Sequence, residues 1–332
     1  KILRMLLLAF ASLYVLFKGY GVVMFSYTFV IVELIVVIIA LFIALSKFIK
    51  LETVIDISLI KSIIKRALPF GFASVFGMMY FFIGSVMLSK IKGDVEVAVY
   101  SVAFNIALAL LFIPTVYTNA IYPVLSRYYD QSKSELKLLY EKSFKYLYII
   151  GLPISLGLFL LAERVILFLY GNKYSASIIA LKIISLYFVI KFINFLLGIV
   201  LSSIGKQNKR MLGQGLTAGL NILLNLFLIP MIGFVGAALS TFITEIFLFI
   251  VYYLFVSKSW YFYNFLKILS KPIIAVIVMV IFIKFTSFGL IITILLSAII
   301  YFILLLILRT FDKEDYGIIR RILKNEALQK DI

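Results

Sequence analysis

The 332-residue sequence contains no cysteine and no histidine, and it has about half as many acidic as basic residues. Without cysteine there are no disulfides and no thiolate chemistry. Without cysteine or histidine, and with its carboxylates scattered, the chain has few possible metal ligands. Serine triads that use histidine and Cys–His nucleophiles are excluded as well. We therefore expect no metal site, no catalytic residues and no cofactor.

Two further absences narrow the function classes. The sequence has no G-x-x-x-x-G-K-[ST] phosphate loop, and the fragment Gly205-Lys206 lacks both the upstream glycine and the following hydroxyl. No stretch between hydrophobic runs is long enough for a soluble transferase domain. The short outer loops also argue against a membrane polymerase or ligase. A built-in ATPase and an enzyme are both disfavoured.

What the sequence has in abundance is hydrophobic residues, which make up 64% of the chain. Soluble domains usually have roughly 45–50%. About 20 apolar residues span the roughly 30 Å hydrocarbon core as a helix. Ten runs reach or approach that length: 5–17, 24–46, 68–89, 97–122, 146–162, 177–203, 211–230, 234–256, 272–285 and 289–308. The sequence predicts an all-α, polytopic bundle in the plasma membrane.

The basic residues alternate with the spans. If the chain begins in the cytoplasm, inside-facing segments hold 24 of the 32 Lys and Arg residues, and outside-facing segments hold six. This excess follows the positive-inside rule and predicts that both termini are cytoplasmic. The net charge of +17 therefore reflects helix ends that meet lipid headgroups, and we expect no nucleic-acid partner.

Three charged residues fall near the middle of their spans: Glu33, Lys191 and Glu245. A charge in hydrocarbon costs about 2.5–3.5 kcal/mol on insertion scales, so these side chains should face the interior of the bundle. One hypothesis is a polar cavity in which Lys191 attracts an anion and the carboxylates accept protons or cations. The alternative is a structural ion pair, such as Lys191 with Glu245, that locks helices together.

Three asparagines accompany these charges. Asn221 and Asn225 share a helix face, and Asn194 lies about one turn beyond Lys191. They should point into the bundle, where they could bind sugar hydroxyls or form interhelical hydrogen bonds, the more common use. Elsewhere, Pro114 and Pro153 lie well inside predicted helices and predict kinks, and the segment Pro230–Gly236 predicts a tight turn between two spans.

Several fragments then resemble a known family. They are Ala67-Leu-Pro-Phe-Gly71, Val99-Tyr-Ser-Val-Ala103, Tyr122-Pro-Val-Leu-Ser-Arg127, Leu169-Tyr-Gly171, Asn221-Ile-Leu-Leu-Asn225 and Gly233-Phe-Val-Gly-Ala-Ala-Leu-Ser-Thr241. Their order and spacing resemble the second half of polysaccharide-biosynthesis flippases. These flippases belong to the multidrug/oligosaccharidyl-lipid/polysaccharide exporter superfamily, which also holds multidrug and toxin extrusion transporters and lipid II flippases.

The resemblance implies a transporter of two six-helix lobes joined by a cytoplasmic linker, often with two extra helices. Mapped onto this chain, it implies the last two helices of a first lobe at 1–46, an amphipathic linker at 47–67, a second lobe at 68–257, two additional helices at 258–308 and a basic cytoplasmic tail at 309–332. Because only two spans precede the linker, either the sequence lacks the first four helices of the first lobe, which we expect, or the protein is a reduced form of the family.

By resemblance, the function is to move a lipid-linked oligosaccharide or polysaccharide precursor from the inner to the outer leaflet by alternating access. The candidate cavity residues are Lys191, Glu245, Glu33, Asn194, Asn221 and Asn225. The expected partners are the lipid-linked sugar, membrane lipids and enzymes of polysaccharide synthesis. Two alternatives stay open: a multidrug exporter driven by Na⁺ or H⁺ through Glu33 or Glu245, and a non-transporting subunit of a synthesis complex.

Overall fold

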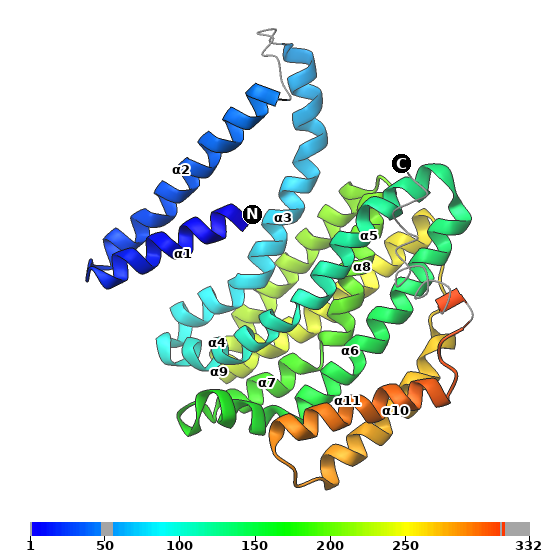
Figure 1. Ribbon diagram of the computed structural model, residues 1–332. Helices are drawn as coiled ribbons and strands as arrows, with labels where there is room; N and C mark the ends of the chain where they lie inside the picture. The colour runs from blue at the N-terminus through cyan, green and yellow to red at the C-terminus, as the bar shows by residue number, and fades with distance from the viewer. Residues whose placement is uncertain (1, 48–55, 313, 316–332) are drawn as a thin grey trace. The chain divides into compact units, whose positions relative to one another are not determined.

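The computed structural model describes residues 2–47, 56–312 and 314–315, and throughout these ranges its regular elements are helices, with no strand. The helices are α1 (Ile2–Phe17), α2 (Val22–Lys47), α3 (Ile57–Lys92), α4 (Asp94–Leu110), α5 (Phe112–Gln131), α6 (Lys133–Tyr170), α7 (Ser177–Ser185), α8 (Phe188–Ser203), α9 (Gln207–Ser259), α10 (Leu266–Phe285) and α11 (Leu290–Ile307), with a short 3₁₀ turn, η1 (Asn172–Tyr174), before α7. Figure 1 shows their order along the chain. The all-α prediction is confirmed.

The chain forms two compact units, residues 1–63 and 64–332. In the first unit, α1 and α2 pack against each other, and Gly19 takes a left-handed φ of 71° in the turn between them. The boundary at residue 63 falls inside the segment predicted as a linker, of which 48–55 lie outside the described residues. The finer division into lobes and extra helices stays a prediction.

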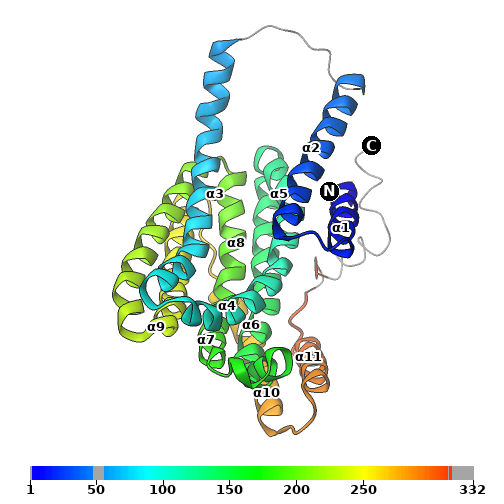
Figure 2. The ribbon, with the colours of Figure 1, turned by 90° about the vertical axis from the view of Figure 1, so that its left-hand side faces the viewer.

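In the second unit, α8 is the central helix. It packs against α5, α6 and α9, and Figure 2 shows it among these neighbours. Most of its side chains are buried, Phe192, Leu196 and Val200 completely. The polar residues of α8 are therefore held among other helices, where each needs a partner. This packing positions the candidate site.

Three breaks in the helices set the number of spans. The helical run 94–131 is interrupted at Leu111, just before Pro114 in the first turn of α5, as the proline predicts. At Pro153, by contrast, α6 continues as one helix from Lys133 to Tyr170. The helices α7 and α8 meet at an angle of 49°. In α9, Ile232 and Gly233 leave helical geometry, and Gly233 has a φ of 59° that disfavours other residues. The turn predicted at Pro230–Gly236 is confirmed.

The breaks reconcile the helices with the predicted spans. Seven described helical segments are long and apolar enough to cross a membrane, and the bent pair α7–α8 adds an eighth. The 53-residue α9 counts once among them, although its turn at Gly233 divides it into two arms. With that division and the shorter apolar α1, each of the ten predicted runs has a helical counterpart. The side on which the termini lie stays a prediction from charge.

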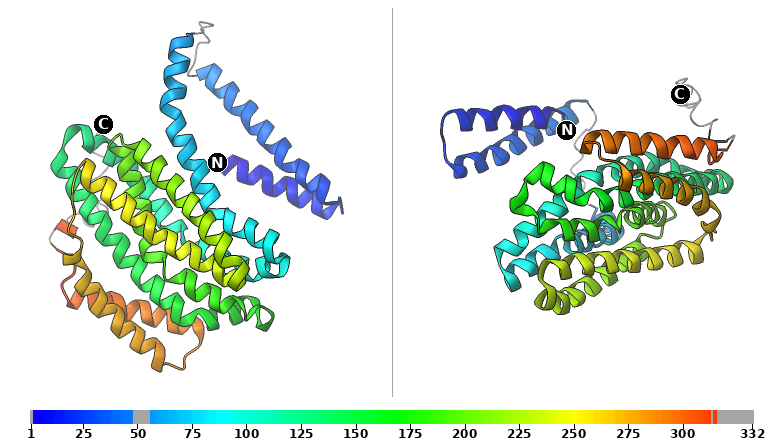
Figure 3. Two further views of the ribbon diagram at one scale, coloured as in Figure 1. Left: turned by 180° about the vertical axis from the view of Figure 1, so that it is seen from behind. Right: turned by 90° about the horizontal axis from the view of Figure 1, so that it is seen from below.

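The last two helices, α10 and α11, pack against each other and against α6. Figure 3 shows this pair, in orange, along one flank of the second unit. The hydroxyl of Tyr301 on α11 donates a hydrogen bond of 2.9 Å to the Ile149 carbonyl of α6. The side chain of Arg164 donates to the carbonyls of Thr286 and Phe288 between α10 and α11. Polar contacts at both ends thus attach the pair to α6.

Candidate functional site

The second unit contains a buried ion pair between α8 and α9. The Lys191 ammonium contacts Oε1 of Glu245, and the two residues are 8% and 0% exposed. The rings of Tyr80, Phe81 and Phe195 surround the ammonium at 5.0, 5.3 and 5.9 Å, at cation–π distance. A buried charge is tolerated when it is paired and hydrogen-bonded, and both conditions are met here.

Two further side chains complete the coordination of the Glu245 carboxylate. Tyr80 of α3 donates its hydroxyl to Oε1 at 2.5 Å. Asn194 of α8 donates to Oε2 at 2.8 Å and also to the Glu245 main-chain carbonyl at 3.0 Å. The carboxylate therefore joins three helices, and each of its oxygens accepts at least one hydrogen bond.

A second polar layer lies beside this cluster, within the hairpin of α9. Asn225 donates to the Asn221 side chain at 2.8 Å, and Asn221 donates to Thr244 on the other arm at 3.2 Å. Thr244 in turn donates to the Ser240 carbonyl at 2.7 Å. All four residues are buried, so the layer joins the two arms of α9 by hydrogen bonds at membrane depth.

The predicted site residues thus fall into two places. Lys191, Asn194 and Glu245 meet directly, and Asn221 and Asn225 lie in the adjoining layer. Glu33 lies in the first unit, where it forms an ion pair of 2.8 Å with Arg4 and is half exposed. The ion pair anticipated between Lys191 and Glu245 is present. A role for these residues in transport stays a prediction.

Sequence reasoning missed Tyr80. Tyrosines usually gather at the ends of membrane spans, but Tyr80 lies at the middle of the predicted span 68–89 and is 4% exposed. A phenol at that depth needs a buried acceptor. Its position in the middle of the span could have identified Tyr80 as a buried polar residue, but it did not stand out among the chain's 21 tyrosines.

A polar pocket of about 180 Å³ opens next to the ion pair. Lys191 and Asn194 line it together with Thr118 of α5 and with Arg210 and Gln214 of α9. Three buried atoms there have no hydrogen-bond partner: Oδ1 of Asn194, Nε of Arg210 and Oε1 of Gln214. Because buried polar atoms are nearly always paired, these three are available to a polar ligand or to water. The pocket therefore offers two free acceptors, on Asn194 and Gln214, and two cationic side chains, Lys191 and Arg210.

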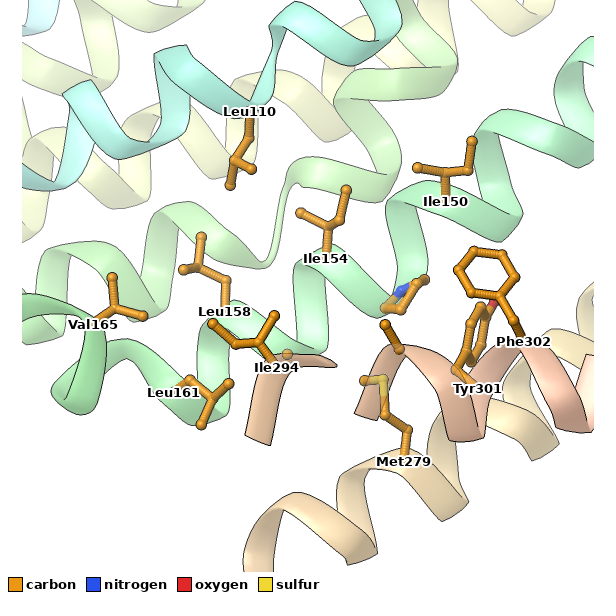
Figure 4. Close-up of a pocket in the computed structure, with 13 residues that line it drawn as sticks. Leu110, Ile150, Ile154, Leu158, Leu161, Val165, Met279, Ile294, Tyr301 and Phe302 are labelled. Carbon is orange, nitrogen blue, oxygen red and sulfur yellow. The ribbon is translucent and has the colours of Figure 1, made fainter. Parts of the chain in front are cut away.

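An apolar pocket of about 300 Å³ lies between α6, α10 and α11. Figure 4 shows Leu158, Leu161, Met279, Ile294, Tyr301 and Phe302 around it. The single phenol hydroxyl among these six is engaged by the Ile149 carbonyl. The pocket therefore offers a hydrocarbon surface and suits an aliphatic chain.

The comparisons with known proteins agree with this fold. The family model Polysaccharide biosynthesis protein matches residues 1–129, and the family model MatE matches residues 69–227. A capsular polysaccharide biosynthesis protein of Staphylococcus aureus, CapF, is 27% identical over 222 residues, which are 64% of this chain and 55% of the relative.

Two solved structures resemble the chain. The lipid II flippase MurJ in an inward closed conformation matches with a TM-score of 0.67 at 18% identity, covering 91% of this chain and 65% of MurJ. An outward-facing multidrug resistance transporter of the MATE family matches with a TM-score of 0.62 at 19% identity, covering 76% of this chain and 60% of that one. The chain thus spans between 55% and 65% of the length of CapF and of these two solved structures.

The two matched families and the solved neighbours are transporters rather than enzymes. The match at 1–129 covers the first unit and the start of the second, and the match at 69–227 lies within the second unit. The chain is a multi-pass membrane protein whose matched family models and solved neighbours are those of the multidrug/oligosaccharidyl-lipid/polysaccharide exporter superfamily.

Proposed function

We propose that this protein is a flippase that moves a lipid-linked oligosaccharide or polysaccharide precursor across the membrane by alternating access. The observation that carries the proposal is the polar pocket in which Lys191 and Arg210 lie beside unpartnered buried atoms. Such a pocket suits an anionic, hydroxyl-rich headgroup, because charged donors can bind phosphate oxygens and the Asn and Gln side chains can bind hydroxyls.

The apolar pocket beside α10 and α11 supports the same proposal. A lipid-linked sugar has a polar head and a long hydrocarbon tail, and the tail must stay in an apolar environment while the head crosses. The pocket of about 300 Å³ provides such a surface on the same unit as the polar pocket. CapF acts in capsular polysaccharide biosynthesis and MurJ is a lipid II flippase, both consistent with a substrate of this class.

The test is flipping of a lipid-linked oligosaccharide in proteoliposomes. We expect the double variant K191Q/E245Q to lose flipping while it still inserts into the membrane. Changing both residues leaves no lone charge buried, which protects the fold better than Lys191→Ala would. K182A is the matched control: it removes a lysine from the neighbouring α7, away from the polar pocket. Normal flipping by K191Q/E245Q would overturn the proposal.

A multidrug exporter is the second candidate, favoured by the MatE match over residues 69–227. In that case Glu245 would alternate between Lys191 and a transported H⁺ or Na⁺. Efflux of a cationic dye, driven by a pH or sodium gradient and absent in K191Q/E245Q, would favour it. Flipping of the lipid-linked sugar without dye efflux would exclude it.

A further inference from the structure

The segment that follows α11 folds back onto α6 through a cluster of opposite charges. The Lys142 ammonium lies 2.6 Å from both carboxylate oxygens of Asp312, 3.2 Å from Asp315 and 3.1 Å from the exposed Glu314. Lys145 contacts Asp315, and the Tyr146 hydroxyl donates to Asp315 at 2.7 Å. The two lysines are 6% and 8% exposed, and Asp315 is completely buried.

The three donors converge because of their spacing on α6. Lys142 and Lys145 are three residues apart, and Tyr146 is four residues from Lys142, so all three lie on one face of the helix. Two buried ammonium groups side by side require an anion. Two cations and a phenol also form the donor set that suits the oxygens of a phosphate group. The carboxylates of Asp312 and Asp315 stand where phosphate oxygens would bind.

A pocket of about 560 Å³ begins at this cluster. Lys142, Tyr146 and Glu135 are among its polar lining residues, and its walls are largely apolar, including Leu139, Ile149 and Phe302. Phe311, adjacent to Asp312, also lines it. A cavity with a cationic end and apolar walls matches an amphiphile that has an anionic head and a hydrocarbon tail.

We propose that Lys142, Lys145 and Tyr146 form a binding site for the phosphate headgroup of a membrane phospholipid, whose acyl chain enters this pocket. Asp312 and Asp315 compete with the lipid for these donors. Their carboxylates occupy the donors until the lipid headgroup displaces them and releases the segment after α11. The site is separate from the polar pocket at Lys191 and does not depend on the substrate that is moved.

The charge balance selects the headgroup. Displacing the segment removes three carboxylates from the lysines, those of Asp312, Glu314 and Asp315, so a headgroup with more negative charge replaces them better, and a phosphomonoester at neutral pH supplies about −1.5 to −2. A phosphodiester supplies only a single charge. We therefore expect phosphatidic acid to bind more tightly than phosphatidylglycerol, and phosphatidylcholine to bind weakest.

The experiment measures lipid binding to the purified protein by native mass spectrometry, with these three lipids carrying the same acyl chains. D312N/D315N removes the two carboxylates that contact both lysines and keeps the lysines, and we expect it to bind phosphatidic acid at least about tenfold more tightly than the unmodified protein. D94N/D130N is the matched control, since it removes two negative charges elsewhere. If D312N/D315N binds phosphatidic acid no more tightly than this control does, the proposal is overturned, whatever the variant does to stability.

Two further arms identify the donors and the ligand. Adding K142Q/K145Q to D312N/D315N should abolish the gain, and retained binding would exclude these lysines. If the fourfold variant does not fold, the comparison of D312N/D315N with its control still decides. Inorganic phosphate should compete only weakly, because it cannot use the apolar pocket. Equal competition by phosphate would replace the lipid with a free anion and overturn the proposal.

Discussion

Lys191 of α8 and Glu245 of α9 form an ion pair inside the second unit, with only 10% and 1% of their side chains exposed. The pair could be predicted from the sequence because both residues occupy the middle of hydrophobic spans. Because both groups are buried, removing either one would leave the other charge buried without a partner.

We predict that single and double substitutions at this pair differ sharply. K191A should destabilise the protein by about 3–5 kcal/mol, because it leaves the Glu245 carboxylate buried without its cation. K191Q/E245Q should lose much less, since amides can keep several hydrogen bonds. Thermal unfolding in detergent measures both, with K182A, which removes the partly buried lysine of α7, as the control. Equal losses from the single and double variants would contradict the coupling.

Gly233 gives a second stability prediction. Its φ of 59° lies in the left-handed region, and a side chain there would run into the Glu96 carboxylate, which accepts a 2.7 Å hydrogen bond from the Phe234 N–H. G233A should therefore cost at least about 1–2 kcal/mol. The control is G219A in the same hairpin, where a methyl group meets nothing within 4 Å.

G219A should be neutral or stabilising by up to about 1 kcal/mol, because alanine is the better helix former. The difference in melting temperature between G233A and G219A measures how much the left-handed conformation at the turn contributes to stability. If G219A is as damaging as G233A, the tight turn is not what makes Gly233 necessary.

The sequence was informative wherever a local rule applied. Span positions follow from hydrophobic length, the break before Pro114 from the missing N–H, and the turn at Gly233 from glycine's freedom. Asn194 was placed correctly beside Lys191, since both lie on one helix. These features depend on residues close together in the chain.

Features that depend on how helices rotate against one another were out of reach. Tyr80 is 165 positions from Glu245, and no periodicity within α3 says which neighbour its hydroxyl will meet. Arg210 was not singled out from the sequence, yet it lines the polar pocket. The contact between Lys142 and Asp312 likewise joins residues 170 positions apart. Such pairs require the packed bundle.

The contact of the tail segment with α6 should depend on pH. Burial tends to raise the pKa of Asp312, but the hydrogen bond from Lys142, the Asp315 N–H and the nearby Lys145 charge outweigh it and lower the pKa to about 2. A lowered folded-state pKa stabilises the fold above the ordinary value of 3.8, and this contribution disappears as the pH falls through about 2.

We therefore expect the difference in melting temperature between the unmodified protein and D312N/D315N to be constant above about pH 5 and to shrink below about pH 4. Asp315, whose pKa is also lowered despite its burial, by Lys145 and Tyr146, acts in the same direction. D94N/D130N serves as the control for general acid effects. A difference that stays unchanged in acid would show that these carboxylates do not hold the segment.

The absence of cysteine makes the orientation directly testable with single introduced cysteines. Lys90 and Ser134 are exposed and lie at the ends of α3 and α6, in segments between predicted spans that the charge pattern assigns to opposite sides. In intact cells, a membrane-impermeant maleimide should label K90C, whereas S134C should react only after the membrane is opened. The two variants control for each other, because each must be reactive under one of the conditions. The reverse result, with S134C labelled in intact cells and K90C protected, would invert the topology and place the Lys142–Asp312 contact on the outer side, where the positive-inside rule disfavours such a cluster of lysines.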